Sequence, residues 1–70
     1  MKYPVVITQG PTSFGAIVPD LPGVYAVGET MEETRDLIAG AIVMHIRALV
    51  ADNEPVPGPS IGMQVVEVAI

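Results

Sequence analysis

The chain has 70 residues; half are hydrophobic, none is cysteine, and eight acidic against three basic residues give a formal charge of −5. This composition excludes disulfide bonds and thiolate metal sites, and the negative charge opposes direct binding to nucleic acid. A domain of this size buries only about 60% of its surface on folding, and the apolar stretch at residues 38–46 is shorter than the roughly 20 residues of a membrane span.

Three short strands are expected in the first part of the chain. In residues 2–8, Tyr3, Val5 and Ile7 form one face of an alternating pattern rich in β-branched side chains, which predicts a strand. Pro4 has no amide hydrogen and therefore favours an edge position for this strand. A turn at Gly10 and Pro11 leads to a second strand at residues 14–18. The sequence "PDLPG" then makes a tight connection to a third strand at residues 24–27.

A long helix is expected next. The sequence "TMEE" at residues 30–33 is typical of a capping box, in which the Thr30 hydroxyl accepts from the Glu33 amide and the Glu33 carboxylate reaches back to Thr30. The helix is expected to run to about Asp52 and to stop at Asn53, followed by Pro55. Apolar residues at three- and four-residue spacing predict the face that packs on the sheet. These are Leu37, Ile38, Ala41, Ile42, Ile46 and Leu49.

A fourth strand is expected at residues 63–70, after the proline-rich sequence "EPVPGPS". The order βββαβ predicts a single α+β domain spanning residues 1–70, an antiparallel meander with one helix packed on a sheet. Because the strands are apolar on both sides and one helix covers only one face, the other face needs a second subunit or a partner. We therefore expect a cytoplasmic protein that forms a dimer or a higher homo-oligomer.

Catalysis is not expected from the residues present. A nuclease of the RNase H type needs several carboxylates around metal ions, one of them on the first strand, and residues 2–8 contain none. Glu33 and Glu67 are too few to replace them. His45, the single histidine, has no identifiable nucleophile or orienting group, so a packed or interface position is favoured. We expect no enzyme activity, no cofactor and no metal.

Acidic residues gather around the first helical turn. Carboxylates there stabilise a helix through its dipole, by about 0.3 to 1 kcal/mol each. The same residues, with Asp20 on the neighbouring loop, also form an acidic patch suited to a basic protein. The two interpretations are compatible. The candidate partner-binding residues are Asp20, Glu29, Glu32 and Asp36.

The chain resembles the HicB-like antitoxin family in four sequences that follow in the same order, "MKYPVVI", "VPDLPGVYAVGETMEET", "AIVMHIRALVADNE" and "PVPGPS". The resemblance implies a truncated RNase H-like fold and a role in a type II toxin-antitoxin system. The implied partner is a small basic mRNA-cleaving toxin, HicA, which such a protein binds and neutralises.

Many members of this family carry a DNA-binding domain after the fourth strand. Because the sequence ends at Ile70, no such domain and no operator binding are expected. The alternative is an orphan oligomeric scaffold or a small-molecule-binding module without a toxin. The two hypotheses differ in what the neighbouring gene encodes. A basic protein of about 60 to 80 residues with a sequence like a double-stranded-RNA-binding domain would favour the antitoxin over the orphan module.

Overall fold

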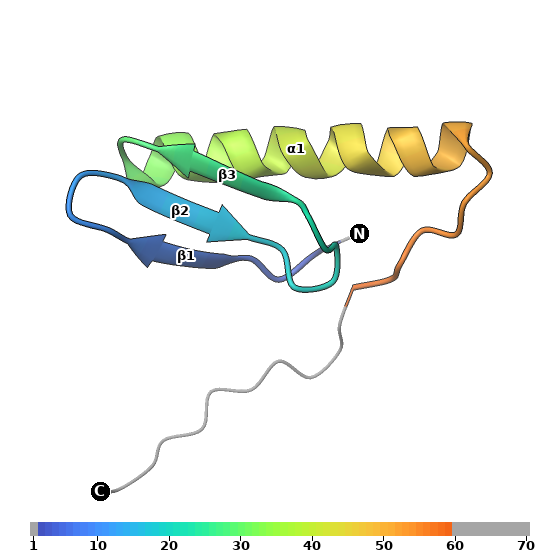
Figure 1. Cartoon of the computed structure of the whole chain (residues 1–70), viewed down its shortest axis with the longest axis horizontal. Coiled ribbons are helices and arrows are strands. Elements are labelled where there is room, and N and C mark those ends of the chain that lie inside the picture. Colours follow the sequence, from blue (N-terminus) through green and yellow to red (C-terminus); the bar gives the residue numbers. More distant parts are fainter. Residues whose placement is uncertain (1, 60–70) are drawn as a thin grey trace, which may run out of the picture.

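The computed structural model describes residues 2–59, which form three strands and one long helix. The strands β1 (Val6–Gln9), β2 (Phe14–Ile17) and β3 (Tyr25–Gly28) make an antiparallel sheet in the order β1-β2-β3. The helix α1 (Met31–Ala51) packs mainly against β2 and β3 (Figure 1). The expected α+β class and the meander are confirmed, and the fourth strand predicted at residues 63–70 lies outside the described residues.

Two strands, β1 and β3, begin later than the sequence pattern predicts, whereas β2 begins at Phe14 as predicted. β1 starts at Val6 rather than Lys2, so Pro4 lies before the strand instead of within it. This placement fits proline, which has no amide hydrogen to donate to a neighbouring strand. The third strand likewise starts at Tyr25, because Val24 donates its amide hydrogen to the Leu21 carbonyl (3.1 Å) and belongs to the preceding turn.

The register of the sheet separates a core face from an outer face. Ile7, Ala16 and Ala26 lie opposite one another across the three strands and belong to the core or pack against it. Side chains alternate along each strand, so the neighbouring positions point away from the helix. Exposed hydrophobic residues occupy these outer positions. They are Val6, Ile17, Tyr25 and Val27.

The turn between β2 and β3 supplies the centre of the core. Leu21, in the sequence "PDLPG", has no exposed surface, and it lies between the buried Val18 and Val24. The Leu21 amide donates to the Val18 carbonyl (3.0 Å), and Gly23 takes a positive φ of 86° that favours glycine. The prolines and glycine of this sequence therefore shape a turn that directs one leucine into the core.

The helix packs with a narrower face than expected. Ile38 is buried, whereas Leu37, predicted to face the sheet, is exposed. The other predicted positions are partly buried. A helix of 21 residues is about 31 Å long and a four-residue strand only about 13 Å. The C-terminal part of α1 therefore extends beyond the sheet (Figure 1).

The predicted start of the helix is confirmed. The Thr30 hydroxyl accepts a hydrogen bond from the Glu33 amide (3.0 Å), as the capping box requires. Among residues 2–59 the reciprocal bond from the Glu33 carboxylate is not formed. The Thr34 hydroxyl instead donates to the Thr30 carbonyl (2.7 Å), and the Thr34 amide donates to the same oxygen (3.0 Å).

A close contact between Gly28 and Thr34 joins the sheet to the helix. Thr34 has no exposed surface. A Cβ atom at Gly28 would lie 2.5 Å from the Thr34 hydroxyl oxygen, which is too close, and 3.0 Å from the Thr34 amide nitrogen, which is a very tight contact. Only glycine therefore allows β3 to pass this near the first turn of α1.

The end of the helix is also as predicted, with a specific geometry. Asn53 adopts a left-handed φ of 56° and donates to the Val50 carbonyl (3.1 Å), while Glu54 donates to the Leu49 carbonyl (2.9 Å). These bonds are those of a Schellman motif with asparagine in the position that glycine usually occupies. The chain then passes the start of β1, where the Tyr3 hydroxyl donates to the Pro57 carbonyl (2.6 Å).

Gly28→Ala is expected to lower the free energy of unfolding by about 1 to 3 kcal/mol, because the new methyl group overlaps Thr34. Gly15→Ala is the matched control, since Gly15 lies in the adjacent strand and a Cβ there meets no atom within 4 Å. Denaturant titration of both variants measures the difference. Equal midpoints for the two variants would show that β3 and α1 are not held this closely.

Thr30→Ala is expected to lower the free energy of unfolding by about 0.5 to 2 kcal/mol, because the Glu33 amide loses its acceptor. The measurement is urea unfolding followed by circular dichroism, with Thr12→Ala in the exposed β1–β2 turn as the control. An unchanged midpoint in Thr30→Ala would place the functional start of the helix elsewhere.

Candidate partner-binding surface

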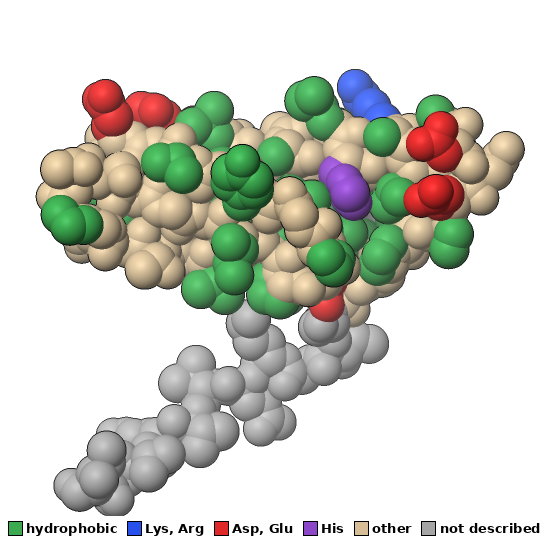
Figure 2. Space-filling view, viewed as in Figure 1, with side chains coloured by type: hydrophobic (Ala, Val, Ile, Leu, Met, Phe, Trp, Pro, Cys, Tyr) green, Lys and Arg blue, Asp and Glu red, His purple; other side chains and the backbone are tan. Residues whose placement is uncertain are grey.

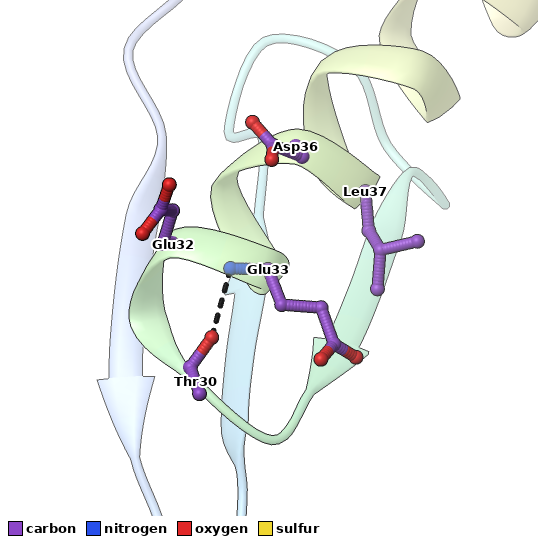
Figure 3. A pocket seen from close by; sticks show the side chains of 5 residues that line it. All are labelled: Thr30, Glu32, Glu33, Asp36 and Leu37. Carbon is purple, nitrogen blue, oxygen red and sulfur yellow. Dashed lines mark hydrogen bonds between the residues drawn. The ribbon is translucent and has the colours of Figure 1, made fainter.

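An open acidic hollow lies at the start of α1. Its volume is about 410 Å³. Glu33 and Leu37 extend to one side of the first turns and Glu32 to the other (Figure 3). The lining residues are Thr30, Glu32, Glu33, Asp36 and Leu37. Apart from the Thr30 cap, these side chains present carboxylates and one exposed leucine, so the hollow is suited to a cationic group.

A second hollow continues around the same helical turns. Glu32 and Asp36 line this hollow as well, together with Met31, Arg35 and Ala39. Arg35 is thus the basic side chain nearest in sequence to the acidic cluster. Glu32 and Asp36 are one helical turn apart, a spacing that places them on one face of α1. Both are exposed, and each can reach a partner without any rearrangement of the helix.

The four candidate residues do not all come together. Glu29 directly precedes the Thr30 cap, so it lies beside Glu32 and Asp36 at the start of the helix. Asp20 lies in the β2–β3 turn, next to the sheet end where Ile17 pairs with Tyr25, whereas Gly28 before Glu29 marks the opposite end. The expected position of Asp20 on a loop neighbouring the cluster is therefore wrong, because antiparallel pairing separates the two ends of β3.

His45 lies in a different hollow, between the start of β3 and the middle of α1. This space has a volume of about 350 Å³, and His45 is partly buried. The lining residues are Gly23, Val24, Tyr25, Ala41, Met44 and His45. The predicted position of His45 on the apolar side of the helix is confirmed. Sequence reasoning missed the hollow itself, because Tyr25 and Met44 meet only through the packing of the strand on the helix.

Between residues 2 and 59, no three side chains of histidine, cysteine, aspartate or glutamate are grouped so that they could hold a metal ion. Within this range α1 also lacks the apolar character needed to cross a bilayer.

Known proteins with similar sequence or structure identify the family. The family model described as the HicB_like antitoxin of bacterial toxin-antitoxin system matches residues 3–68. An uncharacterized 14.9 kDa protein from the rep-hol intergenic region of Haemophilus phage HP1 is 33% identical over 57 residues. That match covers 81% of this chain but 43% of the phage protein, so the chain spans less than half the length of this relative.

The fold is also found in a solved structure. A chain of a HicA3 and HicB3 toxin-antitoxin complex is similar with a TM-score of 0.72 and 28% sequence identity. The similarity covers 86% of this chain and 70% of the other. The sequence family and the three-dimensional fold thus agree over most of the chain. From the match over residues 3–68, the chain belongs to the HicB-like antitoxin family of bacterial toxin-antitoxin systems.

Proposed function

We propose that the protein binds and neutralises a small, basic, mRNA-cleaving toxin of the HicA type. The observation that carries this proposal is the structural likeness, over 86% of the chain, to a chain of a toxin-antitoxin complex. Neutralisation needs only a surface that covers the toxin, so the proposal requires no catalytic group on this chain. A toxin that cleaves mRNA acts in the cytoplasm, and the complex is expected there.

The charge of the chain supports a basic partner. A net charge of −5 on 70 residues attracts a cationic protein over distances of about one Debye length, roughly 8 Å at physiological salt. Glu29, Glu32 and Asp36 concentrate this charge at the exposed start of α1. Charges of this kind mainly raise the association rate and contribute less to the lifetime of the complex.

We also propose that the protein forms a homo-oligomer through the outer face of the sheet. Val6 and Ile17 are paired across β1 and β2 and are exposed, as is Val27 on β3. Tyr25 lies at the edge of this face and also lines the hollow beside α1. The outer positions of the three strands carry no charged side chain. Packing this face on a second copy removes apolar surface from water without burying a charge.

Reversal of two charges, Glu32→Lys with Asp36→Lys, is expected to slow association with the toxin about tenfold, because the field that attracts a basic surface is reversed. The probe is a catalytically inactive variant of the basic HicA-like toxin that is the proposed partner. Surface-based kinetics at two salt concentrations gives the rates, and the difference from wild type should shrink at the higher concentration.

The matched control is Asp52→Lys with Glu54→Lys, which changes the net charge equally at the other end of the helix. Circular dichroism checks that both double variants fold. If both variants slow association equally, net charge and not the acidic cluster attracts the toxin. Absence of any binding by the wild-type chain would contradict the proposed function.

In sedimentation velocity at micromolar concentration, the wild-type protein is expected to be at least a dimer, and Ile17→Lys should shift it toward the monomer. The lysine places a charge at the centre of the outer sheet face, where burial in an interface would remove its hydration. Val43→Lys, on an exposed part of α1, is the control and should leave the oligomer intact. A monomeric wild-type protein would contradict the homo-oligomer.

A further inference from the structure

The hollow beside His45 presents the most exposed large hydrophobic side chains of residues 2–59. Met44 is 74% exposed and Tyr25 is 70% exposed. Both line the same hollow, one from α1 and the other from the edge strand β3. Tyr25 also borders an adjoining hollow formed by the β2–β3 turn, so the apolar surface continues past the end of the sheet.

Exposed aliphatic surface connects this hollow to the acidic one. Leu37, Ala41 and Met44 follow one another at four- and three-residue spacing, which places them along one side of α1. Leu37 is 46% exposed and also lines the acidic hollow with Glu33 and Asp36. The acidic and apolar hollows are therefore consecutive parts of one side of the helix.

The charges along this side point to a basic occupant. No lysine or arginine lines the acidic hollow with Glu33 or the hollow beside His45. Arg35 lines the second acidic hollow, with Glu32 and Asp36, and a groove on the β1 side of the helix. Figure 2 shows the corresponding face, with hydrophobic side chains and the histidine in its middle, acidic side chains toward its ends and a basic side chain at its upper edge. A second copy would bring the same carboxylates to this side, and the repulsion between like charges disfavours its contact here.

We propose that the toxin docks on this side of the molecule, with an apolar side chain of the toxin in the hollow between Tyr25 and Met44. Basic groups of the toxin then lie beside Glu33 and Asp36 in the neighbouring hollow. This inference rests on the proposed function and adds the position of the contact. The two parts of the contact have different effects. The apolar hollow slows dissociation of the complex, and the carboxylates raise its association rate.

The test measures dissociation separately from association. Met44→Ala and Tyr25→Ala are each expected to raise the dissociation rate from the inactive HicA-like toxin by at least about tenfold, as truncation of a central anchor does. The association rate should change by less than about twofold, because neither variant alters a charge. Val43→Ala and Val50→Ala are matched controls, as both are exposed apolar positions of α1 outside this hollow, and they should dissociate like wild type.

Three other results would contradict the proposed docking position or the proposed function. If the toxin binds, but its dissociation rate from Met44→Ala and Tyr25→Ala equals the rate from the wild type, the docking position is wrong while the antitoxin function stands. If the wild-type chain binds no such toxin, the proposed function fails and the inference fails with it. This side of the molecule could instead contact a second copy of the chain. Sedimentation of Met44→Ala tests this, because conversion of an oligomer to a smaller species would assign the surface to a contact between copies. Because Met44 is mostly exposed, Met44→Ala should fold, and circular dichroism verifies this.

Discussion

The corner between β3 and α1 depends on the absence of a side chain at Gly28. Thr34 fills the space where a Cβ would be, and its hydroxyl donates to the Thr30 carbonyl while the Thr30 hydroxyl caps the Glu33 amide. These contacts direct the helix back along the sheet immediately after β3 ends. With this direction established, Ile38 reaches the core formed around Leu21, and the acidic residues of the first turn remain in solvent.

A single helix on a three-stranded sheet leaves apolar surface uncovered. Among residues 2–59 the core contains five buried hydrophobic side chains. Exposed hydrophobic residues remain on the outer face of the sheet and along the β3 side of α1. These two surfaces meet at Tyr25 on β3 and otherwise lie on different sides of the molecule. The molecule therefore has room for a second copy on one surface and a different partner on the other.

The acidic cluster has a structural and an interaction role that do not compete. Glu32 and Glu33 lie in the first turn of α1, where their charge stabilises the helix through its dipole. The same position holds them in solvent, close to the apolar hollow but outside it. A carboxylate buried at the centre of an interface would lose its hydration, whereas a carboxylate at the rim attracts a basic partner at little cost.

The sequence by itself determined the features that depend on neighbouring residues. The Thr30 cap, the stop at Asn53, the turn around "PDLPG" and the α+β order follow from hydrogen bonds and backbone preferences within a few positions. The family resemblance followed from the same sequences. The tertiary structure decided what depends on residues distant in the chain. Antiparallel pairing moved Asp20 to the far end of the sheet from Glu29, and the close approach of β3 to α1 required Gly28 and buried Thr34. The way α1 packs on the sheet leaves Leu37 exposed and places Tyr25 and Met44 around one hollow. Helical periodicity alone does not determine which side of a helix is covered, because this also depends on where the strands lie.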